Sequence, residues 1–230
     1  MFKDFDFPVI LGSLRYLFID GMSLTLTITT TATIGGILLG ILLAMLRLSG
    51  GRVVPRIAAA YVNLFRALPL ILVIFLLFFL MPYVGQWITG DSRPVQVGAY
   101  KSALVTFTLF EAAYFAEIIR SGIQSIPRGQ ISAASALGLN YIQLMGYVVL
   151  PQALRKMAPL LLMQTIILFQ DTSLVYVLSL TDFLGAAAKV ATRSGRLIEM
   201  YIFAAAVYFV ICFAASRLVA VLQIRMSAAN

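Results

Sequence analysis

The sequence predicts an all-α membrane protein with five spanning helices, and three observations lead to this fold class. Hydrophobic residues make up 61% of the 230 residues, charged residues make up only 11%, and the mean hydropathy is +0.98. A soluble domain, by contrast, carries about 25% charged residues. Long apolar segments recur along the whole chain. Because lipid offers the backbone no hydrogen-bond partner, we expect these segments to be helices.

Spanning segments are assigned by length and hydropathy, since a helix needs about 20 mostly apolar residues to cross the hydrocarbon. The first segment is rich in threonine, and we expect its hydroxyls to bond to the preceding helical turn. The third contains Glu111 and Glu117 but has enough apolar residues for a span inside a bundle. The predicted spans are 21–47, 58–82, 97–121, 157–179 and 199–222.

A segment between the third and fourth spans is predicted to stay out of the membrane. Residues 129–154 carry no charge, but they contain six polar side chains and have prolines at both ends. Their apolar residues recur near helical spacing, which indicates an amphipathic helix, a turn at Gly138 and a second helical piece. Within a loop of about residues 122–156, such a segment lies on the membrane surface or against a partner.

The distribution of basic residues predicts the orientation. Five spans place the termini on opposite sides of the membrane. One side then carries ten basic residues, and the other has a net charge of only +1. By the positive-inside rule the C-terminus is cytoplasmic and the N-terminus is outside. The basic residues on the predicted inner side are Arg47, Arg52, Arg56, Arg66, Arg120, Arg128, Arg155, Lys156, Arg217 and Arg225.

Several chemistries are excluded by composition. The chain has no histidine and a single cysteine, Cys212, so we expect no metal site, no catalytic set and no intrachain disulfide. It also lacks a G-x-x-x-x-G-K-[ST] loop, so any ATP must be bound by another chain. The net charge of +8 is explained by loops beside membrane lipid, and no nucleic-acid partner is expected.

Small residues in the first span indicate a close helix contact. Gly36, Gly40 and Ala44 follow the small-x-x-x-small spacing that lets two helix backbones approach. Two interpretations stay open, packing within this chain or an interface with another subunit.

Charges inside the predicted spans are candidates for a transport pathway, because a charge at mid-membrane costs about 2.5–3.5 kcal/mol on insertion scales. Asp171 faces either a structural polar cluster or a substrate path, and Arg66 either reaches the membrane surface or meets an anionic group. Glu117 and Arg120 are three residues apart and are expected to pair. Glu111 has no partner that the sequence identifies. The pathway candidates are Arg66, Glu111, Asp171, Thr172 and Ser173.

The last predicted outer loop is also charged. It contains Asp182, Lys189, Arg193 and Arg196. This basic excess favours acidic solutes or an acidic docking face, or it represents solvated charges scattered along a loop.

The predicted insert contains a motif. Residues 132–151 read S-A-A-S-A-L-G-L-N-Y-I-Q-L-M-G-Y-V-V-L-P. This segment resembles the E-A-A-x-x-x-G-x9-I-x-L-P loop of ABC importer permeases, with Ser132 in place of glutamate and Val148 in place of isoleucine. The stretches beginning at Tyr61, Ala112, Leu150 and Phe169 resemble polar amino-acid uptake permeases over most of residues 20–225, and F-Q-D-T-S-L-V-Y-V-L-S-L is most similar to the glutamate/aspartate permeases.

The resemblance implies the five-helix transmembrane domain of a type I ABC importer in the bacterial inner membrane, with a cytoplasmic coupling helix. It implies an ATP-binding subunit that carries ATP and Mg, a second permease subunit that is a paralogue, and a periplasmic solute-binding protein. It further implies that ATPase coupling depends on Ser132, Ala133, Ala134, Gly138, Leu150 and Pro151. The chain itself is then a transport subunit, not an enzyme.

Other function classes stay open at this stage. The same type of complex could import basic or amide amino acids. A secondary transporter would use Glu111 and Asp171 as proton carriers, although no inverted repeat is visible. A scaffold would dock a partner through the insert without moving solute. A membrane-embedded enzyme would need a nucleophile, base or metal set, which the sequence does not provide.

Overall fold

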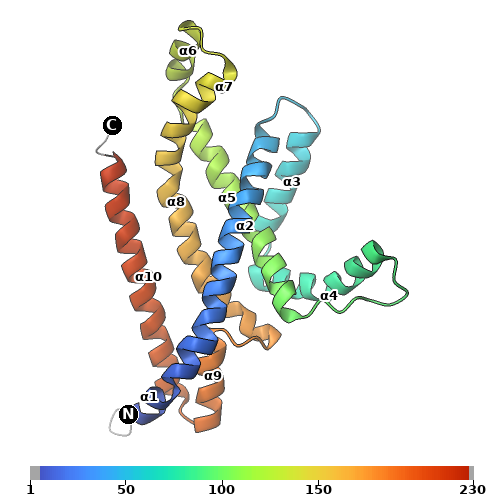
Figure 1. The fold of residues 1–230 in the computed structure, drawn as a ribbon, viewed down its shortest axis with the longest axis vertical. Helices are drawn as coiled ribbons and strands as arrows, with labels where there is room; N and C mark the ends of the chain where they lie inside the picture. The colour runs from blue at the N-terminus through green and yellow to red at the C-terminus, as the bar shows by residue number, and fades with distance from the viewer. Residues whose placement is uncertain (1–5, 228–230) are drawn as a thin grey trace.

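The computed structural model describes residues 6–227, and this part of the chain contains helices and no strand. Figure 1 shows a long, open bundle with a small helical insert at one end. Five helical segments are long and apolar enough to span a membrane, namely Phe7–Leu48, Leu70–Thr89, Ala99–Gln124, Tyr141–Leu178 and Leu197–Met226. The predicted all-α fold with five such helices is confirmed.

The first helix begins earlier than predicted. Helix α1 (Phe7–Arg15), the π-helical segment η1 (Tyr16–Met22) and α2 (Ser23–Leu48) follow one another without a break, whereas the predicted span was 21–47. Asp6 caps the start by accepting a bond from Val9 N at 3.4 Å. The threonine hydroxyls bond to the preceding turn as predicted, for example Thr29 Oγ1 to Thr25 O at 2.8 Å.

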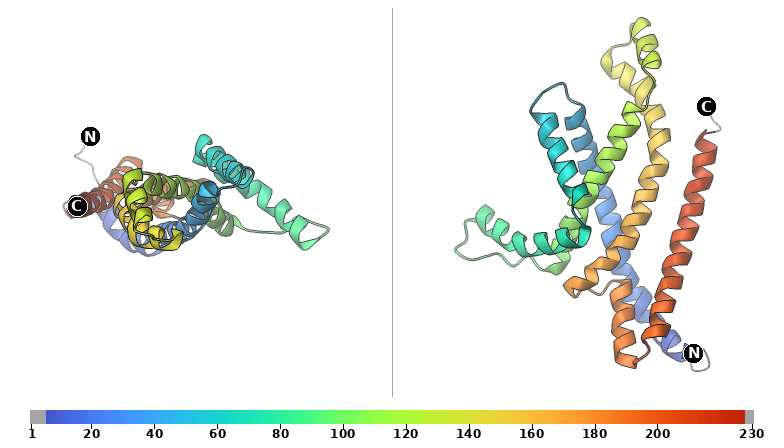
Figure 2. Two further views of the ribbon diagram at one scale, coloured as in Figure 1. Left: turned by 90° about the horizontal axis from the view of Figure 1, so that it is seen from above. Right: turned by 180° about the vertical axis from the view of Figure 1, so that it is seen from behind.

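The second predicted span, 58–82, is broken in the structure. Helix α3 (Val54–Ala67) ends before Leu68 and Pro69, and α4 (Leu70–Thr89) begins after them. Leu68 is extended, with ψ of 140°, because a residue that precedes proline is excluded from the helical region. The apolar helix of this region is therefore α4, which points away from the rest of the bundle (Figure 2).

Helix α5 (Ala99–Gln124) lies at the centre of the bundle and packs against α2, α3, α4 and α8. Gly36 and Gly40 of α2 face it. A Cβ at Gly40 would lie 2.9 Å from Phe115 Cβ and 3.0 Å from Ala116 N. Ala44 is fully buried in the same interface. The small residues of the first span thus serve packing within this chain, and the alternative of a subunit interface is wrong for them.

The fourth helical segment also begins earlier than predicted. After α6 (Arg128–Ala136), four helical segments follow one another without a break, namely α7 (Tyr141–Gln143), the π-helical segment η2 (Leu144–Val149), α8 (Leu150–Asp171) and the 3-10 segment η3 (Thr172–Leu178). The predicted span was 157–179, because the polar residues before it were assigned entirely to the insert.

Two further helices complete the chain. Helix α9 (Phe183–Ser194) is short, and α10 (Leu197–Ser227) runs the length of the bundle where a span was predicted at 199–222. The described chain ends lie at opposite ends of the molecule, and the C-terminal end lies on the side of α6 and α7 (Figure 1). Lys3 and Asp4 precede the first predicted span and so belong to the predicted outer side, but they lie outside the described residues.

Candidate functional site

The insert between α5 and α8 is a small folded unit. Helix α6 ends at Ala136, Gly138 adopts a left-handed conformation with φ of +78°, and Asn140 starts α7 with a capping box to Gln143. The predicted helix, turn and second helix are therefore present. The apolar side chains on the inner side form a core of their own, consisting of Ile126, Ala134, Leu144, Val149 and Ala153.

The structure separates the predicted coupling residues into two groups. Ser132 and Ala133 are exposed on α6, Gly138 is exposed at the turn, and Pro151 is exposed near the start of α8. Ala134 is instead buried in the core of the insert, and Leu150 is half-buried. Within this chain, Ala134 therefore belongs to the folded core of the insert and is not part of its outer surface.

The outer surface of the insert carries four large apolar side chains. Leu137, Tyr141, Ile142 and Tyr147 are between 76% and 82% exposed, although they lie in a segment that also carries many polar groups. Leu137 and Tyr141 belong to the apolar residues that recur at helical spacing in the sequence, whereas Ile142 and Tyr147 were not singled out. A cluster of large exposed apolar side chains rimmed by polar residues marks a surface that binds a partner or the membrane.

The base of the insert is tied to two long helices. Lys156 Nζ donates to Ser125 O at 3.1 Å, which links the start of α8 to the end of α5. A Cβ at Gly122 would lie 3.0 Å from Met157 Cβ, so the two backbones are in close contact there. A force on the insert therefore acts directly on α5 and α8.

A group of charges lies near the same end of the bundle. Glu117 of α5 forms ion pairs with Arg120 and with Arg47 of α2, and Arg66 of α3 lies 3.8 Å from the same carboxylate. The predicted pair of Glu117 with Arg120 is confirmed. Arg47 was missed, because only the tertiary fold brings residue 47 beside residue 117. The carboxylate thus links three helices.

Glu111 has a partner that the sequence did not reveal. It is fully buried, and Gln164 Nε2 of α8 donates to its Oε2 at 3.1 Å. The Cβ of Glu111 also packs on Gly36, where an added Cβ would lie 3.1 Å away. Gln164 is a polar residue in the middle of a predicted span. That position in the sequence could have identified it as a candidate partner for a buried charge.

The remaining pathway candidates do not form one cluster. Asp171 is half-buried at the end of α8 and interacts electrostatically with Glu111. The guanidinium of Arg66 lies 5.7 Å from the ring of Tyr114, which is also within electrostatic reach of Glu111 and Asp171. Thr172 is instead buried and bonds to Phe169 O at 2.7 Å. Ser173 lines a hollow of about 270 Å³ with Gln170 and Tyr208.

The charged residues at the opposite end have different roles. Asp182 is fully buried and caps α9, accepting bonds from Leu184 N at 3.0 Å and Gly185 N at 2.9 Å. Burial raises the pKa of this carboxyl to about 6. Arg196 contacts Glu199 at 3.3 Å and Asp6 at 3.6 Å. Lys189 and Arg193 are exposed on α9.

A long apolar bundle with five helices able to span a membrane, a structured insert and charges held between its helices is typical of a multi-pass membrane protein with a functional polar interior. Comparison with known families specifies the class further. Residues 36–228 match the family described as "Binding-protein-dependent transport system inner membrane component", and the chain belongs to this family.

Individual relatives agree with this assignment. The chain is 51% identical over 222 residues to the glutamate/aspartate import permease protein GltK of Escherichia coli O6:H1, covering 96% of this chain and 98% of the relative. It is 33% identical over 211 residues to the probable glutamine ABC transporter permease protein GlnP of Bacillus subtilis, covering 90% and 93%. A crystal structure of an amino acid ABC transporter with histidines matches with a TM-score of 0.83 and 30% identity, covering 98% of this chain and all of that one.

These findings confirm the predicted resemblance to ABC importer permeases. The family is described as an inner membrane component of transport systems and the relatives are named as permeases, so this chain is a transport subunit and not an enzyme.

Proposed function

We propose that this permease carries glutamate and aspartate into the bacterial cytoplasm. The observation that supports this substrate class best is the 51% identity, over nearly the whole of both chains, to a permease named for glutamate and aspartate import. Relatives named for glutamine alone or for arginine alone are more distant, at 33% and 31% identity. The difference in identity favours acidic over amide or basic amino acids.

The proposed complex has four kinds of component. An ATP-binding subunit holds ATP and Mg and covers the exposed apolar surface of the insert, Leu137, Tyr141, Ile142 and Tyr147. A second, paralogous permease completes the pathway, and a periplasmic solute-binding protein delivers the amino acid at the end that carries α9. The end with α6 and α7 then faces the cytoplasm, in accord with the positive-inside rule.

Coupling follows from the rigid attachment of the insert. Closure of the ATP-binding subunits would displace α6, and the contacts of Lys156 with Ser125 and of Gly122 with Met157 would transmit the displacement to α5 and α8. These two helices carry Glu111, Gln164 and Asp171. ATP would thus shift the population between inward-open and outward-open states through its different affinity for them. Hydrolysis would reset the cycle.

Uptake by the complete complex in proteoliposomes tests this function. Radiolabelled glutamate and aspartate are expected to accumulate only with ATP inside the vesicles and liganded binding protein outside. Excess glutamine or arginine should compete weakly. Uptake that persists without ATP and is abolished by a protonophore would instead indicate an ion-coupled transporter.

Asp171 is proposed to line the pathway, and Asp171→Ala is expected to lower uptake at least tenfold. The residue is half-buried at the end of an apolar helix and lies within electrostatic reach of Glu111, and a purely structural carboxylate would be costly there. Assembly with the ATP-binding subunit should persist, because the insert is distant in the chain. Asp91→Ala, in an exposed loop, is the matched control. Unchanged uptake by the Asp171 variant would assign this aspartate a structural role only.

A further inference from the structure

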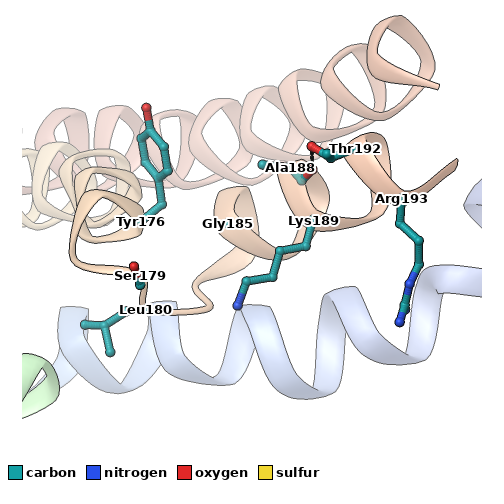
Figure 3. Close-up of a pocket in the computed structure, with 8 residues that line it drawn as sticks. All are labelled: Tyr176, Ser179, Leu180, Gly185, Ala188, Lys189, Thr192 and Arg193. Atoms are coloured by element: carbon teal, nitrogen blue, oxygen red, sulfur yellow. Dashed lines mark hydrogen bonds between the residues drawn. The ribbon is translucent and has the colours of Figure 1, made fainter. Parts of the chain in front are cut away.

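A basic hollow lies between η3 and α9, at the end of the molecule opposite the insert. Its volume is about 480 Å³, within the range of pockets that hold small molecules. Figure 3 shows that Lys189 and Arg193 extend to the same side of α9, whereas the hydroxyl of Tyr176 points away from them. The remaining lining residues are Ser179, Leu180, Gly185, Ala188 and Thr192.

Two cations line the hollow, and neither is neutralised by a nearby surface carboxylate. They are four residues apart on one helix, so they lie on the same face of it. Neither forms an ion pair with an acidic side chain among residues 6–227. Asp182, the acid that interacts with Lys189, is fully buried and already accepts two backbone bonds. An anionic solute in the hollow would therefore meet two positive charges that no ion pair among the described residues offsets.

The position of Lys189 is fixed by a further contact. Its Nζ donates to Thr181 Oγ1, which lies in the segment between η3 and α9. Ser179, in the same segment, has a left-handed backbone with φ of +61° and lines the hollow. The ammonium therefore has a hydrogen-bond partner beside the hollow, although the side chain stays exposed.

We infer that this hollow is a receiving site for the carboxylate of the transported acidic amino acid, with Lys189 and Arg193 as its binding residues. The inference rests on the proposed function and deepens it by naming where the substrate is first held by this subunit. The concave shape and small-molecule volume favour a free amino acid over a protein side chain as the occupant. Holding the released substrate would keep it from diffusing away before the pathway closes behind it.

The test compares the Lys189→Gln/Arg193→Gln double variant with the wild type in the complete complex. We expect the amount of glutamate taken up per ATP hydrolysed to fall about threefold to tenfold, as for the loss of two partly exposed charge contacts. The concentration of liganded binding protein that half-saturates ATPase activity should stay unchanged. Lys189→Arg/Arg193→Lys should retain coupling, and Arg93→Gln, an exposed arginine outside the hollow, should behave as wild type.

An unchanged ratio of uptake to ATP hydrolysis in the double variant would overturn the inference while leaving the proposed function intact. If the half-saturating concentration of binding protein also rises strongly, that result would assign the two cations to protein docking. A wild-type complex that takes up no acidic amino acid would instead overturn the proposed substrate class itself.

Discussion

Gly138→Val is expected to abolish amino-acid uptake and its stimulation of ATP hydrolysis, while the subunit still inserts into the membrane. Gly138 adopts φ of +78°, and no heavy atom lies within 4 Å of the position that a Cβ would take. The loss of function would therefore come from the left-handed backbone conformation, which costs about 1–2 kcal/mol for a residue with a Cβ and more for a β-branched residue. Valine would redirect α7 relative to α6 and disturb the apolar surface of the insert. ATPase and uptake assays on the same proteoliposomes measure the effect.

Two controls isolate the conformation of residue 138. Gly138→Asn should retain most activity, because asparagine tolerates the left-handed region. Gly146→Val places the same side chain elsewhere in the insert, also in open space but without a positive φ, and should affect transport little. Full transport by Gly138→Val would mean that the shape of the insert does not matter for coupling.

Gly40→Val is expected to prevent stable assembly of the subunit. The new Cβ would lie 2.9 Å from Phe115 Cβ and 3.0 Å from the backbone nitrogen of Ala116. Neither group can rotate away, so α2 and α5 must separate, and overpacking of a tight core costs about 1–3 kcal/mol or more. We expect a severalfold lower yield of monodisperse complex after detergent extraction, and a lower melting temperature for what remains.

The matched control is Gly12→Val in α1, where nothing lies within 4 Å of an added Cβ. This variant should give the wild-type yield and melting temperature. If Gly40→Val also matches the wild type, the close contact of α2 with α5 does not hold the bundle together.

The apolar segments could be predicted from the sequence because their signal is local. Hydropathy located five apolar helices, and the spacing of residues 131–148 indicated the helix and turn of the insert. The break at Leu68 and Pro69 was missed although its signal was present, since a proline excludes helix at the residue before it. Because residues 58–82 are strongly hydrophobic, they were predicted as one continuous span that includes this proline.

The partners of the buried charges could not be predicted, because they depend on the tertiary fold. The pair of Glu117 with Arg120 lies within one helical turn and was predicted correctly. Arg47 approaches the same carboxylate across 70 positions of the chain, and Gln164 approaches Glu111 across 53. Only the packing of α2 and α8 on α5 brings these residues together.

Cysteine labelling of the insert tests the central claim, that this surface faces the cytoplasm and contacts the ATP-binding subunit. In a Cys212→Ala background, Leu137→Cys would be compared with Ser194→Cys on α9, both exposed positions near opposite ends of the molecule. A membrane-impermeant maleimide should label residue 137 only in inverted vesicles and residue 194 only in right-side-out vesicles. Binding of the ATP-binding subunit should protect residue 137. Labelling of residue 137 from the outside, or no protection by that subunit, would contradict the account.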